Sequence, residues 1–388
     1  MLEMQFKLSE ERESLRKEVR ELVQDKLAPG VCEREEKGEF PWDIADLMCR
    51  HGLFDMWVPK KYGGVDVGAF ERCLVSEELG KAANDASAIF EVIGLGATPI
   101  RHFGNDQQKA KYLPALAKGD MLCAYALTEP SAGSDVASMQ TSAVLDEEGY
   151  KVNGTKCFIT LADVASFIIV FAKTDTTKGA RGISAFILDL GRQREVPGFS
   201  ITRVENKMSM QDAHTCELAL QDVRILKENL LGVVGQGFTI ALDTLDQGRL
   251  IVGAQGIGIA ESALDYAVDY MKKRAQFGKP LASFQALSFM VADMVMEVEA
   301  ARQLVYAAAT HYDEKGPNAT VYGAIAKAFA TDTAMKVTTN AVQLLGGYGS
   351  TKDYPLEGLM RAAKVTQIYE GTNQIQRLII ARSVLGKF

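Results

Sequence analysis

The sequence predicts an α+β protein with an N-terminal helical domain, a central β-domain and a C-terminal helical bundle. Three observations lead to this prediction. Residues 1–120 carry apolar side chains at helical spacing. Residues 121–232 change to short apolar runs separated by turns, as in a compact β-domain. From residue 233 onward the helical spacing returns, in segments long enough to pack as an antiparallel bundle.

Capping and turn residues predict where individual elements begin and end. Ser9 precedes an amphipathic segment, and Asn105 with Gln108 matches the capping box of a following helix. Residues 86–100 form a largely apolar helix that carries one carboxylate, Glu91. The sequence also predicts strands at 167–171, 183–188 and 216–220, turns at 148–149 and 153–154, and long helices at 282–311 and 320–345.

Composition and charge exclude several classes of function. Hydrophobic residues make up 47% of the 388 residues and charged residues 24%, which is typical of a globular protein. The net charge of −7 argues against general nucleic-acid binding. No apolar run is long enough to span a bilayer, and the charged segment 1–17 has no signal-peptide pattern. We therefore expect a bacterial cytoplasmic protein, with a mature mitochondrial matrix protein as the alternative.

The six cysteines and four histidines are scattered along the chain. No CxxC pair and no HExxH motif occurs, so the sequence predicts neither a disulfide framework nor a metal site. The residues concerned are Cys32, Cys49, Cys73, Cys123, Cys157 and Cys216, and His51, His102, His214 and His311.

One carboxylate near the C-terminus stands in a break between two helical patterns. Glu370 is followed by Gly371, which permits a sharp turn, and by Thr372, which can cap the next helix. A side chain at such a break can project from a rigid support into a cavity, which suits a general base. By itself, the local pattern also describes a helix end with a solvated glutamate.

A loop of small and hydroxyl-bearing residues follows a strand-like run in the central zone. Residues 125–135 read YALTEPSAGSD, with hydroxyls at Thr128 and Ser134. Such a loop can bind a planar heterocycle or a diphosphate through its backbone amides, although an ordinary polar turn has a similar composition. Further along, Phe158 and Thr160 place an aromatic ring beside a hydroxyl, which suits either a ring-shaped ligand or a strand with an exposed threonine.

Two charged groups in the C-terminal zone are candidates for binding a phosphorylated ligand. Residues 272–279 (KKRAQFGK) place cations at a helix end, where they either complement the helix dipole or anchor phosphates, with Phe277 against a base. Arg249 lies inside a helical pattern and needs a partner, which Asp246 can supply. The glycines of 253–258 resemble a dinucleotide fingerprint only superficially, and we assign them to close helix packing.

Together these motifs resemble those of the flavin-dependent acyl-CoA dehydrogenases. The similarity runs from residue 8 to the end of the chain, and the motifs match in order and spacing. They are the TEPSAGSD loop, Arg-x-x-Phe-Gly at 274–278, Gln-x-x-Gly-Gly-x-Gly at 343–349 and Tyr-Glu-Gly-Thr at 369–372. The resemblance implies a β-barrel-like middle domain, a C-terminal four-helix bundle, one FAD per subunit, a homotetramer, and electron transfer to an electron-transferring flavoprotein.

The resemblance also implies roles for individual residues. Glu370 matches the base that removes the α-proton of an acyl-CoA thioester. The positions that match FAD contacts are Tyr125, Leu127, Thr128, Gly133, Ser134, Phe158, Thr160, Arg274, Gln276, Phe277, Gln343, Gly346, Gly347, Thr372 and Gln374. The positions that match the substrate site are Glu91, Ser134, Asp246, Arg249, Tyr369 and Gly371.

The family's reaction is a 2,3-dehydrogenation. In the family, the backbone amide of the base and the flavin ribityl chain stabilise the enolate, and exclusion of water makes the carboxylate more basic. The β-hydrogen leaves as hydride to the flavin, giving a 2,3-enoyl-CoA. We therefore expect an acyl-CoA dehydrogenase.

Several positions leave the details open. Phe158 stands where many members have Trp, Leu161 where they often have Asn, Phe284 where they often have His, and Ala362 where they often have Asp. Glu91 falls where the family lines the far end of the acyl pocket, as a paired structural carboxylate or as a determinant of substrate choice. The expected substrate is a short- or medium-chain acyl-CoA, or an alicyclic one of the cyclohexanecarboxyl type.

Two other functions remain compatible with the scaffold. An acyl-CoA oxidase would pass electrons to oxygen, but such chains are usually longer. A catalytically silent acyl-CoA-binding scaffold would have lost the base or the flavin loop, and this sequence retains both.

Overall fold

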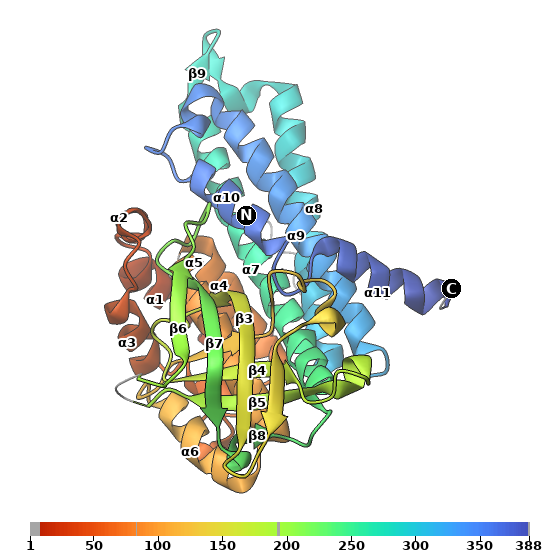
Figure 1. Cartoon of the computed structure of the whole chain (residues 1–388). Coiled ribbons are helices and arrows are strands. Elements are labelled where there is room, and N and C mark those ends of the chain that lie inside the picture. The colour runs from red at the N-terminus through yellow and green to blue at the C-terminus, as the bar shows by residue number, and fades with distance from the viewer. Residues whose placement is uncertain (1–7, 83, 192–194, 387–388) are drawn as a thin grey trace. The chain divides into compact units, whose positions relative to one another are not determined.

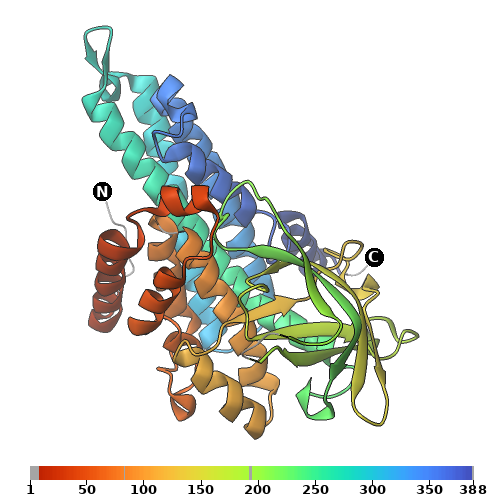
Figure 2. The same cartoon turned by 60° about the vertical axis from the view of Figure 1, so that its left-hand side comes forward.

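The computed structural model describes residues 8–82, 84–191 and 195–386, so Met1–Lys7 of the charged N-terminal segment lie outside the described residues. Helices come first, a sheet follows, and long helices complete the chain (Figures 1 and 2). The predicted α+β fold class is confirmed. The first helices are α1 (Glu10–Leu22), a π-helical turn (Val23–Leu27), α2 (Val31–Lys37), α3 (Trp42–Arg50), α4 (Ala69–Ala82), α5 (Asn84–Phe103) and α6 (Asp106–Ala117).

The strands and the later helices follow in chain order. The strands are β1 (Cys123–Ala126), β2 (Ser142–Leu145), β3 (Tyr150–Thr160), β4 (Phe167–Lys173), β5 (Ile183–Asp189), β6 (Phe199–Val204), β7 (Thr215–Ile225) and β8 (Leu230–Leu231). A small hairpin consists of β9 (Ala275–Gln276) and β10 (Lys279–Pro280). The later helices are α7 (Gly237–Lys273), α8 (Gln285–Asp313), α9 (Ala319–Leu345), α10 (Leu356–Thr366) and α11 (Asn373–Leu385).

The capping signals of the sequence behave as predicted. The Ser9 hydroxyl accepts the backbone N–H of Arg12 at 3.3 Å and caps α1. Asn105 and Gln108 exchange side chain to backbone hydrogen bonds of 2.8 and 3.0 Å, which is the predicted capping box of α6. Both caps satisfy N–H groups that a helix leaves free at its first turn.

One of the two expected turns is wrong. The turn at 148–149 is present between β2 and β3, but residues 153–154 lie inside β3. Asn153 exchanges hydrogen bonds of 2.9 and 2.8 Å with Asp222 across the β3–β7 ladder. The register of that ladder shifts between Val152 and Gly154. The Asn-Gly pair therefore lies at an irregularity within strand β3 and does not form a hairpin turn.

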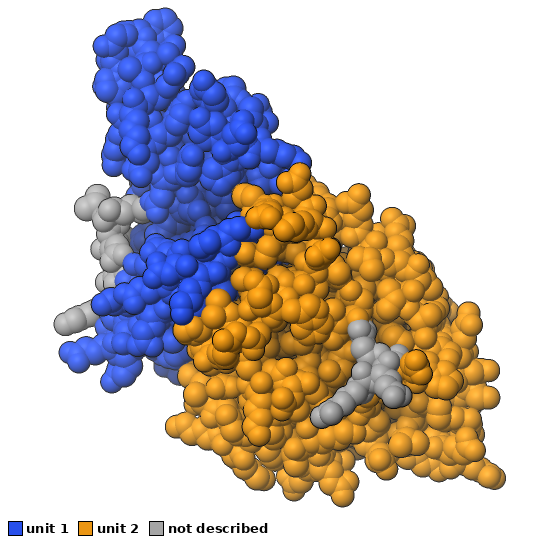
Figure 3. Space-filling model, turned by 90° about the vertical axis from the view of Figure 1, so that its left-hand side faces the viewer, with its two compact units in different colours: residues 1–31, 68–87, 246–388 blue, residues 32–67, 88–245 orange. Residues whose placement is uncertain are grey.

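Residues of the chain cluster in space into two compact units, which Figure 3 colours separately. Unit 1 contains residues 1–31, 68–87 and 246–388, and unit 2 contains residues 32–67 and 88–245. Helices α5 and α7 each contribute residues to both units. Each unit is described by itself below.

Unit 2 is built around the eight-stranded sheet, whose strand order is β6-β7-β3-β2-β4-β5-β8, with β1 pairing in parallel with β4. The apolar core of the sheet includes Val152, Ile168, Val170 and Phe186. Helix α6 packs on the sheet through Tyr112, whose ring lies 4.8 Å from that of Phe167. Phe167 pairs with Cys123 at the start of β1, so this packing supports β1, and the loop that begins at residue 127 follows the other end of the strand.

In unit 1, small residues bring long helices close together. A Cβ added to Gly253 of α7 would lie 3.1 Å from Val305 of α8, and one on Gly258 would lie 2.0 Å from the carbonyl oxygen of Glu77 in α4. Only glycine fits at the second position, because that distance is far below any normal contact. The glycines of 253–258 thus serve helix packing, as the sequence analysis assigned them.

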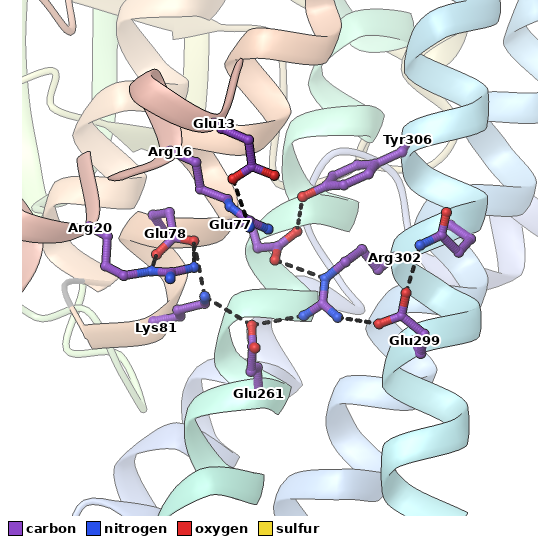
Figure 4. A network of polar contacts seen from close by, with 11 residues as sticks. Glu13, Arg16, Arg20, Glu77, Glu78, Lys81, Glu261, Glu299, Arg302 and Tyr306 are labelled. Carbon is purple, nitrogen blue, oxygen red and sulfur yellow. Dashed lines mark hydrogen bonds and ion pairs between the residues drawn. The ribbon is translucent and has the colours of Figure 1, made fainter. Parts of the chain in front are cut away.

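A buried network of charges ties α1, α4, α7 and α8 together in unit 1 (Figure 4). Arg302 of α8 donates to Glu77 of α4 at 3.0 Å and to Glu261 of α7 at 2.8 Å. Lys81 joins Glu261 to Glu78, with both distances 3.0 Å, and Glu78 also accepts from Arg20 of α1. Buried charges require such mutual pairing, because water no longer solvates them.

Candidate active site

The predicted break between two C-terminal helices is present, and Glu370 stands in it, between α10 and α11. Glu370 has a φ of 52° and Gly371 a φ of 87°. The left-handed region is costly for a glutamate, and such strain is typical of functional turns. The Thr372 hydroxyl accepts the N–H of Ile375 at 3.3 Å, which caps α11 as predicted.

The carboxylate of Glu370 packs against Gly248 of α7. A Cβ added to Gly248 would lie only 2.4 Å from Oε2 of Glu370, so the missing side chain makes room for the carboxylate. Within the described residues, Oε2 is buried and has no hydrogen-bond partner. Burial raises the pKa of Glu370 to about 7, although Arg249 and Lys327 act in the opposite direction. A carboxylate of this kind is a competent base near neutral pH.

The expected pairing of Arg249 with Asp246 is present. Arg249 is buried and donates to Oδ1 of Asp246, while Oδ2 of Asp246 accepts the hydroxyl of Thr320 at 2.6 Å. Burial lowers the pKa of Arg249, and the carboxylates of Asp246 and Glu370 oppose that shift. A buried cation therefore lies beside the candidate base.

Hydrogen bonds also fix Tyr369, which precedes Glu370, and Gly371, which follows it. Tyr369 donates its hydroxyl to Oε1 of Gln255 on α7. Gln376 donates from Nε2 to the carbonyl oxygens of Glu370 at 3.2 Å and of Gly371 at 2.9 Å. Lys327 of α9 donates to the same Gly371 oxygen at 2.9 Å. Within the described residues, the backbone N–H of Glu370 donates to no other group.

In unit 2, the segment from Tyr125 to Ser134 exposes only some of the residues selected from the sequence. Tyr125 and Leu127 are buried at the start of the loop, whereas Gly133 and Ser134 are exposed and Thr128 is half-buried. A Cβ added to Gly133 would have only the Thr128 methyl group nearby, at 4.0 Å. The loop thus offers hydroxyls and an open backbone surface, which fits a planar polar ligand.

A buried ion pair anchors this loop from inside. Glu129 accepts from Lys156 of β3 at 2.9 Å and from the backbone N–H groups of Gln140 and Thr141 at 2.5 and 3.0 Å. Lys156 also donates to the Leu127 carbonyl oxygen at 3.1 Å. Burial lowers the pKa of Lys156 to about 8, and the carboxylate of Glu129 opposes that shift.

Phe158 projects from a bulge in β3. Its φ is 57° and its side chain is 65% exposed, and the β3–β7 register shifts between Lys156 and Ile159. Bulges re-aim side chains, and an aromatic ring this exposed next to the loop is available to stack on a ligand. Thr160 is half-buried, 3.5 Å from the hydroxyl of Thr215.

A second set of selected residues lies together in unit 1. The β9–β10 hairpin, beyond the end of α7 in Figure 2, turns at Phe277 and Gly278, whose φ values of 51° and 77° match a type I′ turn. Phe277 is 93% exposed. The guanidinium of Arg274 lies 5.8 Å from the Tyr348 ring centre, which joins the hairpin to the segment after α9. The other selected residues of these two segments, Gln276, Gln343, Gly346 and Gly347, are exposed, as is Gln374 at the start of α11.

Glu91 is buried in the part of α5 that belongs to unit 2. Trp57 packs along this helix, with its ring 5.1 Å from that of Phe90, and a Cβ on Gly94 would lie 2.5 Å from it. The helix face that carries Phe90 and Gly94 is thus tightly packed against Trp57, and Glu91 is buried on a neighbouring face.

Sequence reasoning missed several residues of these sites, namely Glu129, Lys156, Gly248, Gln255, Lys327, Asn373 and Gln376. Lys327 offered the clearest signal, as a lone cation in the apolar run Ala324 to Ala330. Gln376 bonds to Glu370 and Gly371 in the adjacent turn, and the others contact residues distant in sequence. No local pattern marks any of them. Within the described residues, no group of three His, Cys, Asp or Glu side chains could hold a metal ion, and no helix is long and apolar enough to cross a membrane.

Family models for an acyl-CoA dehydrogenase match nearly the whole chain. The N-terminal domain model matches residues 9–120, the middle domain model residues 124–223, and the C-terminal domain model residues 235–385. The chain belongs to the acyl-CoA dehydrogenase family. The resemblance inferred from the motifs is therefore confirmed, and the protein is an oxidoreductase.

Individual relatives are similar over their full length. The short-chain specific acyl-CoA dehydrogenase of Megasphaera elsdenii is 46% identical, with 98% of this chain and 100% of that protein covered. The solved butyryl-CoA dehydrogenase of the same organism has a TM-score of 0.94 and 45% identity, covering 98% of this chain and 100% of that one. A chain of the structure describing the electron transferring flavoprotein of Acidaminococcus fermentans has a TM-score of 0.95 and 45% identity, covering 99% and 100%.

Membership of this acyl-CoA dehydrogenase in its family decides several of the expectations. FAD is the cofactor and acyl-CoA is the substrate class. The similar Acidaminococcus structure is the one that names an electron transferring flavoprotein, and such a partner stays a prediction for this chain. The homotetramer expected from the motifs is typical of the family.

Proposed function

We propose that this acyl-CoA dehydrogenase oxidises short-chain acyl-CoA thioesters, with Glu370 as the base that removes the α-proton. The observation that carries the proposal is the buried, unpartnered Oε2 of Glu370 on a strained turn. Burial raises the pKa of Glu370 to about 7, so the ionised carboxylate is more basic than an ordinary glutamate. A free carboxylate in water would be far less basic.

The Glu370 turn also offers a hydrogen-bond donor for the thioester oxygen. The backbone N–H of Glu370 has no partner within the described residues, and Gln376 and Lys327 fix the following carbonyls. A preorganised donor aimed at a developing negative charge stabilises an enolate. One residue thus supplies both the base and an oxyanion contact.

The residues of the unit 2 loop fit FAD. Thr128, Gly133 and Ser134 present hydroxyls and open backbone, and the exposed ring of Phe158 can stack on the isoalloxazine. We assign the Arg274–Phe277 hairpin, Gln343, Gly346 and Gly347 to FAD contacts as well, together with Thr372 and Gln374. When bound, FAD accepts the β-hydrogen as hydride. We place the domain boundaries of the family fold at 1–120, 121–232 and 233–388.

Short acyl chains are supported by the Megasphaera relative, which is named short-chain specific, and by the solved butyryl-CoA dehydrogenase. We assign Asp246, Arg249, Ser134, Tyr369 and Gly371 to substrate binding and Glu91 to the choice of acyl group. The alternative is an alicyclic thioester of the cyclohexanecarboxyl type. The bacterial origin of these relatives supports action in a bacterial cytoplasm.

Anaerobic bleaching of the flavin tests this assignment. Butyryl-CoA is expected to bleach the wild-type enzyme faster than octanoyl-CoA or cyclohexanecarboxyl-CoA does. Glu370→Gln is expected to abolish bleaching while retaining the yellow flavin, because an amide cannot accept the proton. Glu91→Gln is expected to change the preference among the three thioesters only. Equal loss of activity in both variants would contradict this division of roles.

A further inference from the structure

Lys327 is a buried cation that the proposed mechanism does not yet use. It lies in the middle of α9, between Ala326 and Ala328, and its side chain is completely inaccessible to solvent. Burying an ammonium group is expensive, so a lysine in this position needs strong compensating contacts. Its contacts therefore indicate why it is there.

The ammonium group of Lys327 reaches the turn that carries the base. Nζ donates to the carbonyl oxygen of Gly371 at 2.9 Å and to Oδ1 of Asn373 at 2.9 Å. Gly371 belongs to the turn and Asn373 is the first residue of α11, so a single cation binds the residues on both sides of Thr372. Both of these acceptors are neutral oxygens.

A second layer of contacts orients Asn373 toward Lys327. Nδ2 of Asn373 donates to the Thr331 hydroxyl oxygen at 2.8 Å and to Asp332 at 2.7 Å. Asp332 pairs through its other oxygen with Arg377. Because the amide nitrogen is taken by Asp332, the amide oxygen must face the lysine.

The Glu370 turn requires such external support. Glu370 and Gly371 both have left-handed backbone conformations, which for glutamate costs free energy that the surroundings must offset. The charged groups that act on the Glu370 carboxylate are Arg249 from α7 and Lys327 from α9. Arg249 forms an ion pair with Asp246, and Asp332 forms an ion pair with Arg377.

We propose that Lys327 is a positioning residue for the reaction, which fixes the Glu370–Thr372 turn through the Gly371 carbonyl and favours the ionised form of Glu370. The inference rests on the proposed role of Glu370 as the base. Lys327 does not touch the reacting atoms, so it acts through the orientation and the charge of its neighbour.

The experiment compares the pH dependence of anaerobic flavin reduction by butyryl-CoA in holoenzyme variants. Lys327→Met removes the charge and the hydrogen bonds, and Lys327→Gln keeps a donor but removes the charge. The matched control is Lys336→Met, because Lys336 is on the same helix, is exposed, and pairs with the partly exposed Glu297. Melting temperature and butyryl-CoA affinity, measured by perturbation of the flavin spectrum, are recorded for every variant.

Lys327→Met is expected to reduce flavin about 100-fold more slowly, the loss typical of a base displaced by about an ångström. In both Lys327 variants the rising limb of the pH profile is expected to move to higher pH by about one unit, because a nearby cation no longer favours the carboxylate. Lys336→Met should match wild type. Unchanged limbs in the folded Lys327 variants would overturn the proposal.

Two further variants keep the outcome decisive. If both Lys327 variants fail to fold, Asn373→Asp leaves the lysine in place and sets a carboxylate against its ammonium, which is expected to move the limb in the same direction. An unmoved limb in Asn373→Asp would overturn the proposal. Glu370→Gln separates the role of Glu370 as the base from the role of Lys327. If Glu370→Gln reduces flavin normally, the proposed function fails. If Glu370→Gln is inactive but the Lys327 variants keep the wild-type pH profile, only the role of Lys327 is refuted.

Discussion

At the scale of single residues, the base depends on the absence of a side chain opposite it. Gly248 gives the Glu370 carboxylate its place on α7, because any Cβ there would lie 2.4 Å from Oε2. Oε2 of this carboxylate is buried, and the backbone of Glu370 has a strained, left-handed conformation. Free energy is thus spent at one residue, as expected where chemistry requires a basic carboxylate.

Replacing Gly248 by alanine is therefore expected to displace the carboxylate and slow flavin reduction by about 100-fold. Gly256→Ala is the matched control on the same helix, because its Cβ would meet its nearest neighbour at an ordinary 3.4 Å. Stopped-flow reduction by butyryl-CoA measures both. A Gly248→Ala enzyme with wild-type rate would show that the carboxylate does not need this space.

At the scale of elements, strands and helices determine which side chains the loops can present. The loop after β1 is held from inside by the Glu129–Lys156 pair, and β3 supplies both that lysine and the bulge that exposes Phe158. Because the anchors are buried, the hydroxyls of the loop remain free on its outer side.

Glu129→Gln is expected to loosen this loop and to weaken FAD binding at least about tenfold, because it leaves the buried Lys156 charge without its partner. Glu148→Gln is the control, since Glu148 lies in the β2–β3 turn of the same unit, is exposed, and pairs with Arg224 of β7. Retention of FAD after dialysis and fluorescence titration of the apoprotein measure the effect. Equal FAD affinity in the two variants would remove the assigned role of the pair.

Sequence predicts elements better than it predicts sites, for physical reasons that particular residues illustrate. Helical periodicity and the caps at Ser9 and Asn105 depend on neighbours within one turn, and both were predicted correctly. The Asn153-Gly154 pair failed as a turn because cross-strand contacts with Asp222 outweighed its local preference.

The break at Glu370 was also predictable from local pattern, whereas its support was not. Lys327 and Gly248 come from helices 43 and 122 residues earlier in the numbering, and only the folded chain brings them to the turn. Motif matching supplied the remaining site residues, because their spacing is shared with a family. Packing partners such as Lys156 carry no motif of their own.

At the scale of the whole molecule, the charge network of Figure 4 joins helices from distant parts of unit 1. Residues of α4 are separated from α7 and α8 by the entire sheet region in sequence. Arg302 is its centre, with three carboxylate partners, Glu77, Glu261 and Glu299. The network therefore fixes how the segments of this unit assemble.

Arg302→Met is expected to destabilise the protein by about 3–5 kcal/mol, because it leaves the buried Glu77 charge uncompensated. Lys17→Met, which removes the exposed pair with Glu21, is expected to cost less than about 1 kcal/mol. Thermal and urea denaturation of the holoenzyme measure both changes. Similar stability losses in the two variants would argue that the buried network contributes no more than a surface pair.

The most direct test of the central claim is the pH dependence of anaerobic flavin reduction in the wild-type enzyme. If Glu370 is the base, with a pKa near 7, the reduction rate at low butyryl-CoA concentration rises with pH and levels off above about pH 7. The reason is that only the ionised carboxylate accepts the α-proton. A flat profile from about pH 5 to about pH 9 would contradict the assignment of Glu370 as the base.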